Sequence, residues 1–201
     1  EKILMATGRA PAVDAFKDIG LHIEKSGVVV DEYLKTNIDN IYAVGDVTGK
    51  SMLAHVASHQ GITAVKNILG ENEKIDYKAI PSCVYTSPEV ASVGMTEDEA
   101  RRLFRDNIRV GRFPYAASGK AKTLGEVNGF VKIISESKYN EILGVHIVGP
   151  SATELIAEAV LAIKLECTAE ELANTIHAHP TLSEATMEAA FDLLAEPIHK
   201  L

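Results

Sequence analysis

The stretch Gly129-Phe-Val-Lys-Ile-Ile-Ser135, followed after a short polar break by Ile142-Leu-Gly-Val-His-Ile-Val148, decides the fold of the second half of the chain. Short runs rich in Val and Ile that are bounded by polar residues are typical of β-strands. Similar runs occur at Cys83–Tyr85, Glu89–Val93 and Ile108–Phe113. Together these five segments predict an antiparallel sheet.

Helices are expected to back this sheet. Thr96-Glu97-Asp98-Glu99 is a capping box that predicts a helix to about Arg105. Ser151–Glu154 and Thr168–Glu171 repeat the pattern, and Glu184–Ala195 predicts a last helix. We therefore expect an α+β domain over residues 80–201, in which helices cover one antiparallel sheet.

Residues 1 to about 75 have the character of α/β material. Lys2–Arg9 reads as a buried strand that runs into a glycine turn, and Gly27–Asp31 and Asn40–Asp46 predict two more strands. Ser51–Leu69 predicts a helix closed by Gly70. Its apolar side is expected to consist of Leu53, Val56, Ala57, Ala64, Val65 and Ile68.

Composition excludes several classes of protein. The 201 residues carry 28 Asp and Glu against 20 Lys and Arg, a net charge of −8, and the basic residues are scattered. This argues against nucleic acid and anionic membranes as main partners. No apolar run approaches the roughly 18 to 20 residues of a spanning helix. Two cysteines are too few for a disulfide scaffold and indicate a reducing compartment, which we expect to be the cytoplasm.

The beginning of the chain suggests that it is part of something longer. The first residue is Glu1 rather than Met, and the strand pattern starts at once. We expect Glu1 to be an internal position of a longer polypeptide. Residues 71–79 are polar and are expected to link the two parts of the chain.

Asp46 is the first candidate ligand residue. It ends the apolar run Tyr42-Ala43-Val44-Gly45, at the edge where α/β sheets bind ligands, and its carboxylate suits hydroxyl donors. Taken alone, the dipeptide Gly45-Asp46 favours an ordinary turn over a ligand site, since Asp is a common turn former. The helix expected from Ser51 adds free N–H groups and a positive dipole end, which suit an electron-rich ligand.

His179 and Glu184 form the second candidate site. His179 precedes Pro180, so its backbone is expected to be extended at the mouth of a helix. Glu184 lies five residues on and is close enough to hold the imidazole, which makes the other ring nitrogen a better proton acceptor. Thr181-x-x-Glu184 is equally a capping box, so spacing alone leaves a catalytic pair and a helix cap open. His177 is assigned to structure.

The cysteines and the other histidines give little evidence of a functional site. Cys83 and Cys167 have no close partner in sequence and are expected to be small core residues. Only His55 and His59 stand at a helical ligand spacing, without a third ligand, so no metal site is expected. A Gly-x-Gly-x-x-Gly fingerprint does not occur in the sequence.

The order of several segments resembles that of the flavin disulfide oxidoreductases. His-Pro-Thr-Leu-Ser-Glu is closest to the branch that oxidises dihydrolipoamide, because the glutathione-reducing branch usually lacks that Leu. The resemblance covers nearly the whole chain. Its segments are Ala6–Pro11, Thr36-Asn37, Ile41–Asp46, Met52–His55, Tyr85–Gly94 and His177–Glu184.

This resemblance implies a division of the chain and a set of cofactor contacts. Residues 1–10 would end an NAD-binding domain, with Gly8 near the nicotinamide cofactor. Residues 11–79 would complete an FAD-binding region, in which Asp46 meets the ribitol. Residues 80–201 would form the interface domain of a homodimer. The backbone that would face the flavin ring belongs to Met52, Leu53, Ala54 and His55.

The resemblance also implies a reaction. His179 of one subunit would act as general acid/base for the redox disulfide and flavin of the other, with Glu184 orienting it, which favours the catalytic pair. Electrons would pass from protein-bound dihydrolipoamide through the disulfide and FAD to NAD⁺. The partners would be lipoyl domains and the core of a 2-oxoacid dehydrogenase complex, in the cytoplasm or, in a eukaryote, the mitochondrial matrix.

The sequence lacks two motifs that are typical of the family. The first dinucleotide fingerprint and the Cys-x-x-x-x-Cys redox pair of the family do not occur in it. We therefore expect the isolated chain to be inactive, to keep the dimerising fold and to bind FAD weakly or not at all. A non-catalytic dimerisation module and another disulfide reductase of the family are the alternatives, although residues 196–201 lack the paired cysteines of a mercuric reductase.

Overall fold

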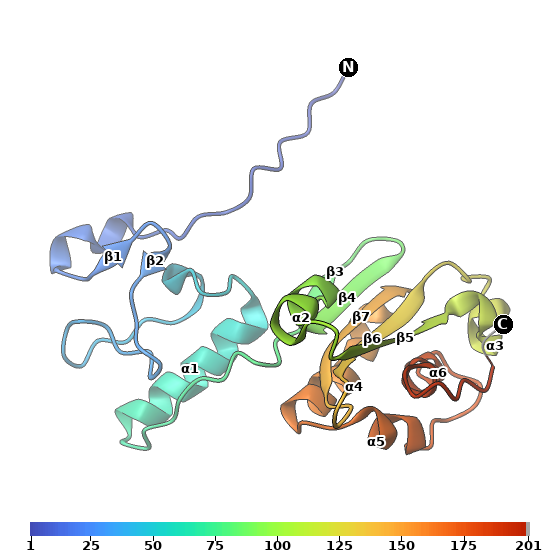
Figure 1. Ribbon diagram of the computed structural model, residues 1–201. Coiled ribbons are helices and arrows are strands. Elements are labelled where there is room, and N and C mark those ends of the chain that lie inside the picture. Colours follow the sequence, from blue (N-terminus) through green and yellow to red (C-terminus); the bar gives the residue numbers. More distant parts are fainter. Residues whose placement is uncertain (200–201) are drawn as a thin grey trace. The chain divides into compact units, whose positions relative to one another are not determined.

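The computed structural model describes residues 1–199 and falls into two compact units, which divide between Asp76 and Tyr77. Figure 1 labels the elements of both. None of the helices formed by residues 1–199 is long and apolar enough to cross a membrane.

The second unit is built on a five-stranded antiparallel sheet of order β3-β4-β7-β6-β5. This confirms the predicted sheet, and each of the five predicted strands is present. Alternate side chains point to the same face of a strand, so Val131, Ile133, Val145 and Ile147 share the buried face. The strands are β3 (Ser82–Val84), β4 (Glu89–Gly94), β5 (Ile108–Pro114), β6 (Phe130–Glu136) and β7 (Ile142–Gly149).

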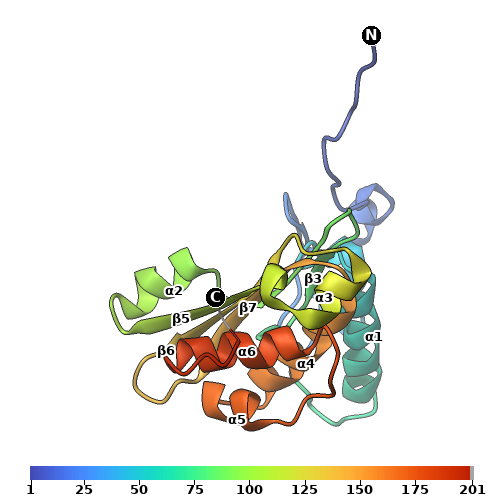
Figure 2. The same cartoon turned by 90° about the vertical axis from the view of Figure 1, so that its right-hand side faces the viewer.

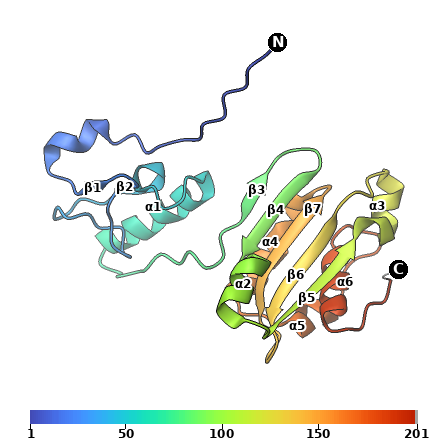
Figure 3. The same cartoon turned by 45° about the horizontal axis from the view of Figure 1, so that its top comes forward.

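Helices cover that buried face. Figure 3 shows α4 (Ala152–Lys164), α5 (Ala169–Asn174) and α6 (Glu184–Leu193) behind the sheet, and α2 (Glu97–Phe104) in front of it. One core joins the sheet to the helices behind it. The predicted α+β layer arrangement is therefore confirmed. Two short elements that the sequence analysis did not predict lie between β5 and β6, namely η3 (Tyr115–Ala117) and α3 (Gly119–Leu124).

Local sequence fixes two helix starts, and a tertiary contact fixes a third. The predicted capping boxes form at Thr96 with Glu99 and at Thr168 with Glu171. Ser151 makes no side-chain cap, so the box predicted there is wrong. Glu89 of β4 instead accepts hydrogen bonds from the Thr153 N–H (2.9 Å) and hydroxyl (2.7 Å), which hold the pKa of its carboxyl below the ordinary value.

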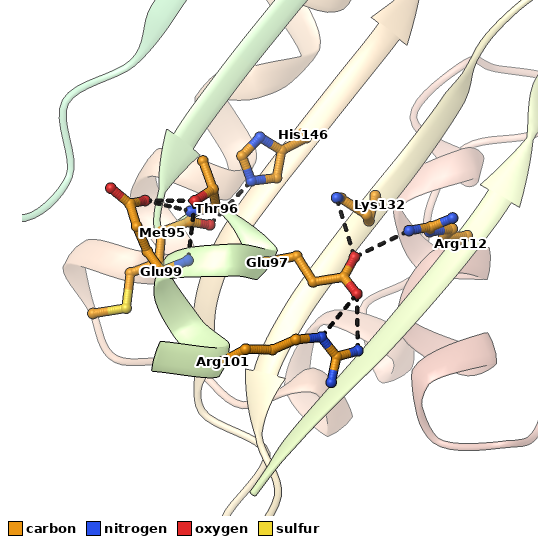
Figure 4. A network of polar contacts seen from close by, with 8 residues as sticks. All are labelled: Met95, Thr96, Glu97, Glu99, Arg101, Arg112, Lys132 and His146. Carbon is orange, nitrogen blue, oxygen red and sulfur yellow. Dashed lines mark hydrogen bonds and ion pairs between the residues drawn. The ribbon is translucent and has the colours of Figure 1, made fainter. Parts of the chain in front are cut away.

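A cluster of charges ties α2 to the outer face of the sheet (Figure 4). The Glu97 carboxylate accepts hydrogen bonds from Arg101 (2.8 Å), Arg112 (3.0 Å) and Lys132 (3.4 Å). The ion pair with Arg101 lowers the pKa of Glu97, burial opposes this, and Lys132 lowers it further. Beside this cluster, the His146 ring bonds to the Met95 carbonyl at 3.0 Å. These contacts have a structural role, because they join an otherwise polar helix to β5, β6 and β7.

Close contact with β5 determines the position of α6. A Cβ atom at Gly111 would lie 2.1 Å from the Ala189 carbonyl oxygen and 2.6 Å from Leu193 Cβ, so only glycine fits. The helix contributes small side chains to the same contact, since Ala185, Ala189 and Ala190 are fully buried. The backbone of α6 is therefore held directly against the sheet.

The first unit contains less regular structure than predicted. Its elements are η1 (Asp14–Ile19), β1 (Ile23–Glu24), β2 (Gly27–Val28), η2 (Gly45–Thr48) and α1 (Ala54–Ile68). The strand predicted over Gly27–Asp31 is reduced to two residues that pair antiparallel with β1. The strand predicted over Asn40–Asp46 is wrong, since it makes one bridge, Lys35 with Tyr42, and then turns into η2.

The strand predicted over Lys2–Arg9 is also wrong. These residues have no regular structure, and Ile3, Leu4 and Met5 are almost fully exposed. A strand satisfies its backbone groups through a neighbouring strand, and none of the strands in residues 1–199 pairs with this segment. An apolar sequence alone is therefore not enough to form one.

Helix α1 begins three residues later than predicted, and its buried side matches the prediction only in part, since Val56 and Ala64 are buried as predicted. Leu53 is its N-cap, and Gly70 follows its end with a φ of +93°, as predicted for a closing glycine. The Gln60 carboxamide oxygen accepts a hydrogen bond from the Gly45 N–H at 2.5 Å. Val56, Gln60 and Ala64 are therefore turned inward. Val65 and Ile68, predicted on the apolar side, are mostly exposed.

We predict that Gly111→Ala destabilises the fold by about 1 to 3 kcal/mol, because the added methyl group overpacks the contact between β5 and α6. Urea unfolding measures this loss. Gly119→Ala is the matched control, since nothing lies within 4 Å of a Cβ there. Equal stability of the two variants would contradict the assigned close contact.

Candidate active site

His179 and Glu184 meet where the loop after α5 enters α6. The ring Nδ1 of His179 lies 2.8 Å from Oε1 of Glu184, the first residue of the helix. The histidine side chain is 77% exposed and the glutamate side chain 23% exposed. The backbone thus holds a half-buried carboxylate behind a solvent-facing imidazole. This is the pairing that the sequence analysis proposed.

The second oxygen of Glu184 accepts a hydrogen bond from the backbone. Its Oε2 accepts a hydrogen bond from the Thr181 N–H at 2.7 Å. Within residues 1–199 the Thr181 hydroxyl accepts no hydrogen bond from the Glu184 N–H; it lies 2.7 Å from the Ala178 carbonyl oxygen, to which it donates, and 2.9 Å from the Ser183 hydroxyl. The glutamate half of a capping box is therefore present without the threonine half. One carboxylate oxygen therefore contacts the imidazole and the other contacts the backbone ahead of the helix.

The ionisation state of Glu184 determines which nitrogen of the His179 ring carries the proton. Burial raises the pKa of this carboxyl, but hydrogen bonds from Thr181 and His179 outweigh it and leave the pKa below its ordinary value. An ionised carboxylate only accepts hydrogen bonds, so Nδ1 of His179 carries the proton. Nε2 has no hydrogen-bond partner within residues 1–199 and is available to exchange a proton.

His177 has the structural role assigned to it. Its side chain is almost buried, Nδ1 lies 2.8 Å from the Thr175 carbonyl oxygen, and Nε2 lies 2.8 Å from Oε1 of Glu158 on α4. Both ring nitrogens are occupied by protein atoms. His177 therefore anchors the loop that presents His179.

Asp46 lies in a polar group of the first unit. Its carboxylate, on η2, is 53% exposed and 3.6 Å from a guanidinium nitrogen of Arg9, and Arg9 also donates to the Met52 carbonyl at 2.7 Å. The structure thus brings together two predicted residues, Asp46 and Met52. Arg9 was not among the predicted site residues, although the quoted segment Ala6–Pro11 contains it.

The start of α1 fits an electron-rich group. Its N-cap, Leu53, provides no side-chain hydrogen bond, and Ala54 and His55 form the exposed first turn. The nearby Asp46 carboxylate is an acceptor for hydroxyl groups. These features suit the ribitol and ring of a flavin. Gly8, with a φ of +83° and no atom within 4 Å of a Cβ, is exposed in the segment before Arg9.

Neither cysteine forms a redox or metal site. Cys83 and Cys167 are unpaired and partly buried, and burial raises the pKa of the Cys83 thiol. Such a thiol is a poor nucleophile. Among residues 1–199, no group of three His, Cys, Asp or Glu side chains is arranged to hold a metal ion.

Comparison with protein families matches both units. Residues 80–190 match the pyridine nucleotide-disulphide oxidoreductase dimerisation domain, and residues 1–61 match the pyridine nucleotide-disulphide oxidoreductase domain. The chain is 45% identical to a dihydrolipoyl dehydrogenase of Halobacterium salinarum, 46% to one of Thermus scotoductus and 45% to one of Bacillus subtilis. These matches cover 99 to 100% of this chain but only 42 to 44% of the relatives.

Solved structures show the same fold. LpdA from Mycobacterium tuberculosis is 31% identical, with a TM-score of 0.83 over 90% of this chain and 40% of its own. The flavoprotein disulfide reductase RclA from Escherichia coli, described as HOCl-induced, is 29% identical, with a TM-score of 0.81 over 90% of this chain and 42% of its own. The chain spans less than half the length of the proteins it matches.

We predict that Glu184→Gln lowers the free energy of unfolding by about 1.5 kcal/mol at pH 7, because a charged acceptor is lost. The folded state lowers the pKa of Glu184, so its stabilisation is complete above the ordinary value of 4.5 and disappears as pH falls through the lower folded value. The difference between wild type and variant should therefore narrow toward pH 3. Urea unfolding at both pH values measures it.

The exposed carboxylate Glu126 provides the control, since Glu126→Gln should leave the unfolding free energy nearly unchanged at either pH. A Glu184→Gln deficit that stays constant from pH 7 to pH 3 would contradict the assigned role of the ionised carboxylate.

Proposed function

Because the chain belongs to the pyridine nucleotide-disulphide oxidoreductase family, we propose that it supplies the dimerisation domain and the adjoining FAD-binding part of a dihydrolipoyl dehydrogenase. One observation carries the proposal. His179 is held at Nδ1 by an ionised Glu184 while its Nε2 faces solvent. The names of the curated relatives support the choice of substrate.

His179 acts as the general acid/base. Thiol–disulfide exchange needs a thiolate, so the thiol of dihydrolipoamide must lose its proton before it attacks a disulfide. Nε2 of His179 accepts that proton, and Glu184 stabilises the resulting imidazolium and keeps the ring oriented. When bound, FAD and NAD⁺ would supply the two-electron chemistry that turns the dithiol into a disulfide.

The first unit contributes flavin contacts. Asp46 would accept hydrogen bonds from ribitol hydroxyls, and the backbone of Met52–His55 at the start of α1, where Leu53 gives no side-chain cap, would face the flavin ring. Arg9 holds Met52 and Asp46 in place through its two contacts. Gly8 would lie near the nicotinamide cofactor. The positive end of α1 favours negative charge on a reduced ring.

The proposed enzyme works as a homodimer, in which His179 of one subunit serves the disulfide of the other. The match to a dimerisation domain supports this arrangement. Its partners are lipoyl domains and the core of a 2-oxoacid dehydrogenase complex, and the two unpaired cysteines are compatible with the cytoplasm. A related disulfide reductase is the second candidate, favoured by the likeness to RclA.

We predict that His179→Gln in the complete enzyme lowers turnover of dihydrolipoamide by about 10² to 10⁴, the usual contribution of a general base. The rate at which NADH reduces the flavin should be unchanged, because this step takes no proton from a thiol. The loss of flavin absorbance measures this rate. Size-exclusion chromatography should still give the dimer.

His146→Gln serves as the control. His146 bonds to the Met95 carbonyl, and its side chain lies between the buried Val145 and Ile147 on β7, so it points to the face of the sheet opposite α6. Wild-type turnover in His179→Gln would remove the general-base role and favour the non-catalytic dimerisation module. Low turnover with lipoamide but high turnover with another disulfide would favour the second candidate.

We also predict that the 201-residue chain alone loses FAD on dialysis. It contains no Gly-x-Gly-x-x-Gly segment for the pyrophosphate and spans only 42 to 44% of its curated relatives. The absorbance of flavin in the retained fraction measures this. Stoichiometric flavin after dialysis would show that the contacts within this chain are sufficient.

A further inference from the structure

The chain reverses direction after α6. The Ala195 N–H donates to the Asp192 carbonyl at 3.0 Å and the Glu196 N–H to the Phe191 carbonyl at 2.9 Å, which is the hydrogen-bond pattern of a Schellman motif. Ala195 adopts the left-handed conformation there, with a φ of +64°. Pro197 follows and prevents the helix from continuing. Figure 2 shows the chain returning beside α6.

Glu188 receives the returning segment. It lies in the middle of α6 and is only 2% exposed. Its Oε2 accepts hydrogen bonds from the backbone N–H groups of Ile198 (3.3 Å) and His199 (3.1 Å), and its Oε1 lies 2.6 Å from Nδ1 of His199. A buried carboxylate is costly unless it is fully hydrogen-bonded, so these three donors explain how Glu188 is tolerated.

This arrangement repeats that of the active-site pair. In both, one carboxylate oxygen accepts from Nδ1 of a histidine and the other from a backbone N–H. Glu184 and Glu188 are four residues apart on one helix and therefore lie on the same side, one turn apart. The charge of His199 also contributes to lowering the pKa of Glu184, after its burial and its bonds to Thr181 and His179.

We propose that Glu188 and His199 form a second histidine–carboxylate pair that positions Glu184 and, through it, His179. The inference rests on the proposed function, since it assigns positioning residues to that reaction. His199 touches no reacting atom. If it is removed, Glu188 loses a donor, and the middle of α6 must shift to regain one from water. The first turn of the same helix carries Glu184, and a base is sensitive to displacements of about 1 Å.

The test compares two substitutions of His199 in the complete enzyme. His199→Ala removes the donor, and His199→Asn keeps an N–H group close to the position of Nδ1. His199 is 69% exposed, so neither change should prevent folding. We expect His199→Ala to lower kcat with dihydrolipoamide about tenfold at unchanged KM, and His199→Asn to restore kcat to within about threefold of wild type.

Flavin reduction by NADH provides the second readout and should be equal in all variants, because it does not use His179 as a base. His146→Gln is again the matched control on the other face of the sheet. Wild-type kcat in His199→Ala would overturn the proposal. So would a His199→Asn variant as slow as His199→Ala, or an equal loss of flavin reduction by NADH.

Measuring His179→Gln in parallel distinguishes a failure of the positioning role of His199 from a failure of the proposed function. A slow His179→Gln enzyme with a fast His199→Ala enzyme removes only the positioning role. If His179→Gln is itself as fast as wild type, the proposed function falls and the positioning role falls with it.

Discussion

The two oxygens of the Glu184 carboxylate bind different parts of the molecule, and the geometry of the candidate site depends on this division. Oε2 holds the Thr181 N–H ahead of α6, and Oε1 holds Nδ1 of His179. The helix start and the imidazole are therefore fixed by the same charged group. A cap alone would leave the ring to rotate, and an imidazole pair alone would leave the loop backbone unsatisfied. The exposed position of His179 is compatible with a defined orientation for this reason.

Glu184 can hold both partners in place only if α6, which carries it, is itself fixed. Packing against the sheet fixes α6. Gly111 on β5 lets the backbone of α6 approach at Ala189, and small buried residues line the contact. On the outer face, Glu97 gathers three cationic side chains and holds α2. The polar contacts of Glu97 thus attach a helix that has little apolar surface. By contrast, α6 packs on the sheet through small apolar side chains, and the Asp192 carboxylate adds a hydrogen bond from the Arg112 N–H of β5 at 2.8 Å.

Local signals predicted the second unit well and the first unit poorly. The boxes at Thr96 and Thr168 and all five strands were recognisable, because their hydrogen-bond partners lie within a few residues or their apolar runs are short and bounded. The box at Ser151 failed because Glu89, 64 residues away, caps Thr153. On α1, Val56 and Ala64 are buried as predicted, but Val65 and Ile68 are exposed, and Gln60 turns inward to Gly45. The pair of His179 and Glu184 was found by spacing, whereas Arg9 carried no local signal of its contacts with Asp46 and Met52.

The strand order has a consequence for the sequence of folding events. β5, β6 and β7 are neighbours in the chain and in the sheet, whereas β4 pairs with β7 across the whole meander. Contacts between nearby segments form fastest, so we expect the meander to form first and β4 to join it later. Because α6 packs on β5 and β6, a nascent chain that ends before Glu184 exposes part of an apolar sheet face to water. Such a chain is prone to aggregate until α6, which begins with Glu184, has been synthesised.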